Sequence, residues 1–278
     1  MYLLFVAYFV IGLVIGSFLN VCIYRLPDGK SIVSPPSACG SCGHRLGVLD
    51  MIPVLSYFML DGKCRYCGIP YSPRYALVEF LTGCLFVLCG FYYLPGITLA
   101  LVFVFVACLI VLTFVDFDYQ IILDEVLIMM LVCGAAYVYF SHGDYWDALY
   151  GMGFAGGLML ICGAGYVYFS HGDYWDALYG MGFAGGLMLL IFVLSRGGMG
   201  AGDVKLSFVL GLWLGLKASI VCLMLAFILG GAIGVFLLAA GIKQRKDPIP
   251  FGPFLCLGAF ISLLYSPYLI YYYWRLFI

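Results

Sequence analysis

Charged residues are scarce in this chain of 278 residues. Lys and Arg together number 13 and Asp and Glu 14, so charged side chains make up 10% of the sequence, against 65% hydrophobic residues. A soluble domain carries about 25% charged residues. The mean hydropathy is +1.11, and there is too little polar sequence to cover the surface of a globule. This composition excludes a soluble protein and predicts a polytopic membrane protein.

Other features are also missing. The net charge is −1, and no basic tract is long enough to indicate a nucleic-acid partner. No GxGxxG loop follows a predicted strand, as a dinucleotide cofactor site would require. The first apolar stretch, from Tyr2 to about Ile23, has neither a charged n-region nor a small-residue cleavage site. We therefore expect it to be a retained first span and not a cleaved signal peptide.

Long apolar runs are what the chain has instead. Stretches of about 20 apolar residues suffice to cross a bilayer. They predict spans at about 2–23, 76–94, 97–116, 125–140, 149–169, 178–195, 204–217, 218–241 and 251–275. The expected fold class is all-α: a transmembrane helical bundle of about eight spans plus one duplicated segment. The expected domains are a first helix (1–23), a polar loop (24–75) and a membrane domain (76–278).

The polar loop is basic and proline-rich. Its cations are Arg25, Lys30, Arg45, Lys63, Arg65 and Arg74. Such loops lie on the cytoplasmic side of membrane proteins, so the N-terminus is expected outside. The next two spans are joined by a tight turn at Pro95-Gly96, which returns the end of the second one to the cytoplasmic face.

Two aspartates interrupt the apolar sequence. Asp116 ends the run VLTFVDFDYQ, and Asp203 follows the glycine-rich break GGMGAGDVKL. A carboxylate in or at the edge of a bilayer costs roughly 2.5 kcal/mol or more, which suggests a chemical role. Paired carboxylates can share one proton and activate a water against a peptide bond. The pair indicates an intramembrane aspartic peptidase; the alternative is two helix-end carboxylates in the headgroup region.

The polar loop contains four cysteines in two CxxC pairs. Cys39 and Cys42 form the first pair, and Cys64 and Cys67 form the second after a gap of 21 residues. This spacing is close to that of a zinc ribbon, and four thiolates complete a closed, structural site. Disulfides, or thiols without a role, are the alternatives, but a reducing cytoplasm disfavours disulfides. We expect the other eight cysteines, which stand singly in apolar runs, to be packing or lipid-facing residues.

Four blocks in this order resemble bacterial type IV prepilin peptidases (leader peptidase/N-methyltransferase). They are GSFLNVCIYRLP at 16–27; the CxxC pairs with IPVLSY between them and SPRYALVEFLTG after them; VDFDYQIILDE; and GMGAGDVKL followed by PIPFGPFL. The resemblance implies an enzyme of the bacterial inner membrane. It would cleave the basic leader of prepilins or pseudopilins at the cytoplasmic face and methylate the new N-terminal residue with S-adenosylmethionine.

By the same resemblance, Asp116 and Asp203 correspond to the catalytic aspartates. Gly200 and Gly202 would let backbone approach substrate closely. The resemblance links the cysteine loop (24–75) to the methyltransferase region and makes 76–278 the membrane-embedded aspartic peptidase domain, but it gives no individual methyltransferase residues.

Other polar residues receive more modest interpretations. Asp118 and Asp124 lie just past a helix end and are expected to be solvated at the interface. Lys205 marks the cytoplasmic boundary, or else depresses the pKa of a nearby carboxylate. Glu79 is a weak candidate for contact with the basic leader.

One feature departs from the family. Residues 133–161 recur almost verbatim at 162–190, differing only at the fourth and last positions. This indicates a recent tandem duplication or an assembly error, since two copies are too few for a solenoid. His142 and His171 are copies of one another and are expected at the interface.

The duplication bears on topology. If both copies crossed as full spans, Asp203 would lie about 30 Å from Asp116, across the membrane. We therefore predict that the extra unit does not cross as a full span. The competing hypotheses are an inactive paralogue or membrane scaffold, a presenilin-type GxGD protease and an archaeal preflagellin peptidase; the last two should lack the CxxC loop.

Overall fold

The computed structural model describes residues 2–142, 173–195, 199–244 and 249–277 of the chain. Its elements are the helices α1 (Tyr2–Arg25), η1 (Val48–Met51), α2 (Leu55–Met59), α3 (Arg74–Tyr92), α4 (Ile97–Tyr119), α5 (Asp124–His142), α8 (Asp173–Ser195), α9 (Ala201–Ala239) and α10 (Gly252–Phe277). Within these residues the only β-type pairing is two isolated bridges, both in the polar loop.

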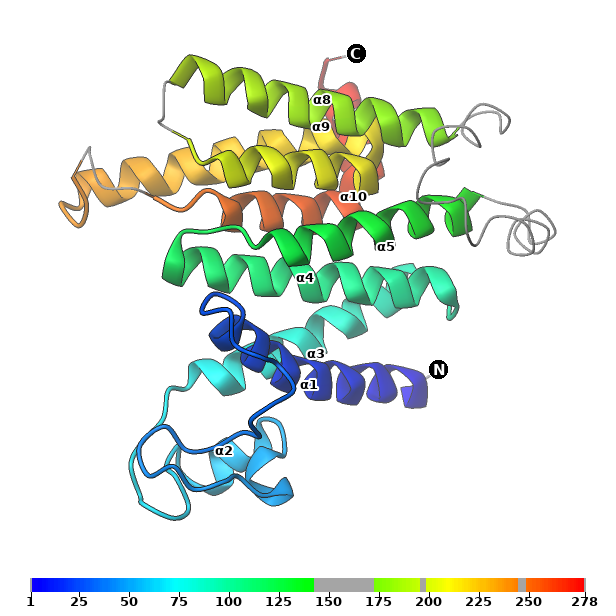
Figure 1. The fold of residues 1–278 in the computed structure, drawn as a ribbon. Coiled ribbons are helices and arrows are strands. Elements are labelled where there is room, and N and C mark those ends of the chain that lie inside the picture. Colours follow the sequence, from blue (N-terminus) through cyan, green and yellow to red (C-terminus); the bar gives the residue numbers. More distant parts are fainter. Residues whose placement is uncertain (1, 143–172, 196–198, 245–248, 278) are drawn as a thin grey trace.

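The long helices run side by side in one bundle (Figure 1). Six of them are long and apolar enough to cross a membrane: α1, α3, α4, α8 (from Tyr174), α9 and α10 (to Tyr271). Helix α5 lies in the same bundle, and α9 contains two helical arms. The described residues therefore contain eight helical segments that run along the length of the bundle. The expected all-α transmembrane bundle is confirmed.

Helices α1 and α3 meet through glycines. A Cβ added at Gly12 would lie 2.6 Å from Cα of Gly83, and one added at Gly16 would lie 2.7 Å from Cα of Glu79. Because lipid tails are as apolar as leucine, helices in a membrane associate through close van der Waals packing, for which small residues are suited. The GSFLN block thus brings α1 directly against α3.

Helix α9 breaks at Gly215, where φ is 70° and ψ is 179°. This backbone region is essentially restricted to glycine. The arms 201–214 and 216–239 run side by side in opposite directions (Figure 1). At the break the N–H of Leu216 donates a hydrogen bond to Asp176 Oδ1 of α8 at 3.3 Å. The sequence prediction of separate spans at 204–217 and 218–241 reflects this reversal.

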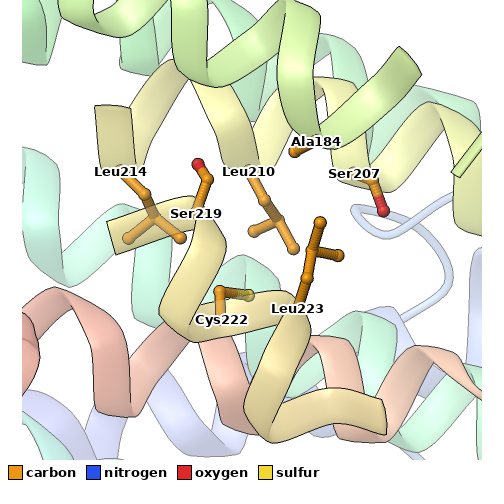
Figure 2. A pocket seen from close by; sticks show the side chains of 7 residues that line it. All are labelled: Ala184, Ser207, Leu210, Leu214, Ser219, Cys222 and Leu223. Atoms are coloured by element: carbon orange, nitrogen blue, oxygen red, sulfur yellow. The ribbon is translucent and has the colours of Figure 1, made fainter. Parts of the chain in front are cut away.

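The space between the two arms is filled by small and apolar side chains. In Figure 2, Ser207 and Leu210 of the first arm and Ser219 and Leu223 of the second surround one gap, closed on the far side by Ala184 of α8. Ser207, Ser219 and Leu210 are almost fully buried. None of the lining residues is charged, so this gap is packing between helices and carries no candidate for catalysis.

The prediction about the duplicated unit concerns residues 143–172, which lie outside the described residues. What is described is one helix on each side of them: α5 ends at His142 and α8 begins at Asp173. The C-terminal end of α5 and the N-terminal end of α8 are at the same end of the bundle (Figure 1). Residue Asp173 is the second copy's equivalent of Asp144, so α5 and α8 carry the helices expected of a single copy.

Replacing Gly215 by alanine tests the break in α9. The added Cβ would meet Asp176 and would force alanine into a glycine-only conformation. The expected cost is about 1–3 kcal/mol, seen as a lower midpoint of unfolding in mixed detergent by circular dichroism. Gly231→Ala, on the second arm in open space, is the matched control and should not lower the midpoint. Equal midpoints for the two variants would contradict the account.

Candidate active site and metal centre

Asp116 lies in the last turns of α4 and is only 5% exposed. Helix α4 ends three residues later, at Tyr119. The next residue, Gln120, adopts a left-handed conformation (φ 56°), and its N–H bonds to the carbonyl of Asp116 at 3.0 Å. The carboxylate Oδ2 accepts a hydrogen bond from the backbone N–H of Gly252 at 3.0 Å. Because Gly252 is the first residue of α10, Asp116 faces the positive end of a helix dipole.

Asp203 lies in the first turn of α9 and is 8% exposed. The backbone N–H of Gly200 hydrogen-bonds to its carboxylate, and Gly200 is the residue that caps the helix. A carboxylate in the first turn of a helix is stabilised by the free N–H groups and by the dipole. Asp203 therefore has the same type of support as Asp116, from a different helix.

The two aspartates lie at the same end of the bundle and within electrostatic range of each other. Ile122, in the turn after α4, lies between their glycines: a Cβ at Gly202 would be 2.8 Å from Ile122 Cγ1, and one at Gly252 would be 2.7 Å from Asp116 Oδ2. Only glycine fits at these two positions without displacing a neighbour. Two buried carboxylates within electrostatic range of each other can act as an acid and a base on one water.

Asp118 and Asp124 lie beside the pair but at the surface. Asp118 forms an ion pair with Arg74 at 2.6 Å, and Asp124 forms one with Lys205 at 2.8 Å. Asp118 is about one-third exposed and Asp124 almost two-thirds, as expected for solvated interfacial residues. The partner of Lys205 is therefore Asp124.

Arg74 joins the polar loop to the catalytic end of α4. Besides pairing with Asp118, its guanidinium donates to the carbonyl of Phe114 at 3.4 Å and lies 4.9 Å from the centre of the Phe114 ring. The two residues that Arg74 contacts, Phe114 and Asp118, lie two positions before and two positions after Asp116 in the sequence. The first residue of α3 is thus fixed to the end of α4 that carries Asp116.

Glu79 differs from its expected role. Its side chain is buried between α1 and α3, and its Oε2 accepts a hydrogen bond from the N–H of Val54 at 2.7 Å. A carboxylate in this position is not available to a basic peptide. Glu79 instead attaches the middle of the polar loop to the side of α3.

The four loop cysteines come together as two matching knuckles. The N–H of Cys39 bonds to the carbonyl of His44, and the N–H of Cys64 bonds to that of Ile69, each at 2.9 Å. In both, a glycine with positive φ follows the second cysteine: Gly43 at 71° and Gly68 at 69°.

All four sulfurs lie within 4.8 Å of one another. Sulfurs on a tetrahedral zinc would be about 3.8 Å apart, given a bond of about 2.3 Å. The Sγ atoms of Cys39 and Cys67 are 3.9 Å apart.

The charge behaviour of these thiols fits a metal site. Hydrogen bonds from the backbone N–H groups of Cys42 and Ser41 lower the pKa of the Cys39 thiol to about 6. The N–H of Ile69 acts in the same direction on Cys67, but desolvation and the neighbouring sulfurs outweigh it and raise the pKa of Cys67 to about 11. Four thiolates this close cannot all ionise unaided, whereas a divalent cation would stabilise all of them. The cluster could therefore hold a metal ion.

The remaining cysteines mostly pack. Those at positions 22, 89, 108, 222 and 256 are buried, Cys133 is partly exposed and Cys84 is exposed. Cys162 and His171 lie outside the described residues. His142 is the last residue of α5, and nothing further is described of its side chain.

Three contacts near the site were not predicted from the sequence: the Gly252 bond to Asp116, the Arg74 bond to Asp118 and the Val54 bond to Glu79. The motifs PIPFGPFL and SPRYALVE contain Gly252, Arg74 and Glu79, so the motifs indicated that these residues belong to the site. They gave no indication of partners as distant as the 136 residues between Asp116 and Gly252.

Comparison with known proteins gives concordant matches. A family model described as the Bacterial Peptidase A24 N-terminal domain matches residues 10–93, and one described as the Type IV leader peptidase family matches residues 103–235. No solved structure matches.

Similar curated proteins are prepilin leader peptidase/N-methyltransferases. That of Aeromonas hydrophila is 31% identical over 289 residues, covering 95% of this chain and 92% of the relative. That of Bacillus subtilis is 29% identical, covering 95% and 96%. That of Dichelobacter nodosus is 32% identical, covering 92% and 89%.

Cobalt(II) binding tests the metal centre. Reduced, metal-free protein titrated with Co²⁺ should develop the thiolate charge-transfer absorption of a tetrahedral site, because four sulfurs converge on one point. Cys42→Ser should lose most of this absorption, and Cys84→Ser, which alters an exposed cysteine on α3, should retain it. Equal spectra for both variants would show that the four cysteines do not bind one ion.

Proposed function

Because this chain belongs to the type IV leader peptidase family, we propose that it cleaves the leader from prepilins or pseudopilins and methylates the new N-terminal residue. Peptidase and methyltransferase activity both appear in the names of its relatives. The observation that supports cleavage most strongly in this chain is the pair Asp116 and Asp203, two buried carboxylates within electrostatic range of each other at one end of an apolar bundle. An inactive paralogue or scaffold would have no need to bury them.

In this mechanism Asp116 and Asp203 hold one proton between them. The ionised carboxylate takes a proton from a water, whose oxygen attacks the scissile carbonyl carbon. The protonated carboxylic acid donates its hydrogen to the carbonyl oxygen. When the resulting tetrahedral gem-diol collapses, the C–N bond breaks and the amine nitrogen takes up a proton from the pair. One hydroxyl of the gem-diol returns its proton to the pair as the C=O bond re-forms. The helix N-termini at Gly252 and Gly200 stabilise whichever carboxylate is ionised.

Zinc is our proposal for the four-cysteine cluster, with Cys39, Cys42, Cys64 and Cys67 as ligands. Four sulfur donors with tetrahedral spacing favour zinc and leave no open position for substrate. Bound metal would supply folding free energy to a loop that has little apolar core of its own. Elemental analysis of protein purified without added metal identifies the ion.

S-adenosylmethionine is the methyl donor that the methyltransferase activity implies. When bound, it supplies an electrophilic methyl group to the amine that cleavage releases. Its site in this chain is not assigned to particular residues.

We also propose that the aspartate pair and the cysteine loop face the bacterial cytoplasm. The loop carries six basic residues and is fixed to the aspartate end of the bundle through Arg74. Loops rich in Lys and Arg are retained on the cytoplasmic side. The basic leader of a prepilin would then meet the enzyme before its apolar segment leaves the membrane.

Substitution of the aspartates tests the peptidase. Asp116→Asn and Asp203→Asn should each lower kcat/KM for leader cleavage by about 10³-fold or more, because each removes a proton-transfer group. Methylation of a pilin that already lacks its leader should persist, which separates loss of chemistry from misfolding. Asp118→Asn, two residues from Asp116, is the matched control. It breaks only a surface ion pair worth about 1 kcal/mol or less, so it should still cleave. A fully active Asp203→Asn would refute the mechanism.

Deletion of residues 143–171 tests the duplicated unit. It joins His142 to Gly172 and restores the Gly-Asp-Tyr-Trp sequence that follows His142 in the full chain. Because α5 and α8 keep their sequences and ends, both proteins should cleave prepilin at comparable rates. Deletion of α8 alone (173–195) removes a crossing and should abolish cleavage. An active shortened chain beside an inactive full chain would mean that the duplication disables the enzyme.

A further inference from the structure

The middle of the polar loop exposes a dense set of large apolar side chains. They lie on η1 and α2 and are Val48, Leu49, Met51, Leu55, Phe58 and Met59. Phe58 is 70% exposed and Met59 75%. In an otherwise polar loop such a surface marks an interaction site. We refer to residues 48–59 as the apolar loop segment.

One face of the segment turns toward the protein. Ser56 is buried, and the Tyr57 ring packs against Gly62 and edge-on to Tyr71 at 5.4 Å. Leu55, Phe58 and Met59 stand at positions i, i+3 and i+4 of α2, so they share the opposite face. The segment is therefore amphipathic, with its apolar side directed away from the protein.

The segment lies beside the membrane-spanning helices and not beyond their ends. The N–H of Val54 donates to Glu79, which is five residues into α3. At a rise of 1.5 Å per residue this point is about 7.5 Å along the helix from Arg74. Amphipathic segments that lie in the membrane interface are buried about 5–10 Å. Figure 1 shows α2 at the flank of the bundle, level with the C-terminal end of α1.

The backbone of Val54 is fixed in an unusual conformation that directs the chain here. Its φ is 62° and its ψ is −49°. For a β-branched residue this is a strained conformation, retained only where the surroundings impose it. The hydrogen bond to the buried carboxylate of Glu79 supplies that constraint, so Val54, the residue directly before α2, is held against α3.

The part of α3 that holds the loop also carries apolar side chains exposed on its other side. Leu77, Phe80 and Leu81 of α3 are exposed on the same stretch of helix as Glu79. In the same loop Arg45 and Lys63 are exposed, and cations near a membrane surface attract anionic lipid headgroups. Arg65 is instead paired with Asp50 at 2.7 Å.

We propose that the apolar loop segment is an interfacial membrane anchor. Leu55, Phe58 and Met59 enter the acyl boundary of the monolayer at the aspartate end of the bundle, and Arg45 and Lys63 face anionic headgroups. Both ends of the loop are joined to membrane spans, so the segment is always next to lipid. A protein partner would have to displace that lipid, and lipid is therefore the favoured occupant. The anchor holds the cysteine cluster at the membrane surface close to Asp116.

Site-specific photocrosslinking tests the anchor. The full chain, with p-benzoylphenylalanine at position 58 or 59, is reconstituted into vesicles of phosphatidylethanolamine and phosphatidylglycerol without substrate and irradiated. Lipid adducts, read by mass spectrometry, are expected at both positions. Position 41, a polar site at the tip of the first knuckle, should give none. Because no substrate is present, the result does not depend on the proposed peptidase activity.

A charge placed on the apolar face provides a second measurement. Leu55→Asp should strongly reduce lipid labelling at position 58, because a carboxylate resists entry into the acyl boundary. Val33→Asp, at an exposed apolar loop residue outside the segment, should leave the labelling unchanged. The proposal is overturned if positions 58 and 59 give no lipid adducts, or if they crosslink to a second copy of the chain. It is equally overturned if added prepilin replaces lipid as the crosslinked species.

Discussion

The structure depends on the burial of two carboxylates in an apolar helical bundle. Asp116 and Asp203 are each less than one-tenth exposed, in surroundings where an ionised group costs several kcal/mol. Two helix N-termini offset this cost, because Gly252 of α10 donates to Asp116 and Gly200 before α9 donates to Asp203. The arrangement requires the end of α4 and the starts of α9 and α10 to meet, so the number of crossings between them is constrained.

This constraint explains how a duplicated sequence can be reconciled with an intact site. Helix α5 leaves the aspartate end and α8 returns to it, and the described ends of both helices at residues 142 and 173 are at the opposite end together (Figure 1). The break of α9 at Gly215 then provides one more reversal, which brings the chain back for α10. Each of these steps preserves the side of the membrane on which Asp116 and Asp203 lie.

Much of the architecture could be predicted from the sequence because hydropathy is a local property. Windows of apolar residues predicted the described bundle helices to within about five residues at either end, while the span expected at 149–169 lies outside the described residues. The spacing of Cys39, Cys42, Cys64 and Cys67 predicted their convergence. The contacts of Glu79 were not predictable, since a lone carboxylate on an apolar helix does not reveal which N–H it will meet. The same holds for Gly252, because a helix start carries no mark of the residue it will face 136 positions away.

The polar loop and the aspartate pair are joined by few but well-placed contacts. Arg74 binds Asp118 and the Phe114 carbonyl, on either side of Asp116 in the sequence, while Glu79 fixes the loop to the side of α3.

The central claim is that Asp116 and Asp203 work as one acid and one base. The pH dependence of kcat/KM for leader cleavage tests it most directly. The account predicts a bell-shaped profile, because activity is lost both when the two carboxyls are protonated and when both are ionised. A profile without an acidic and a basic limb would contradict it.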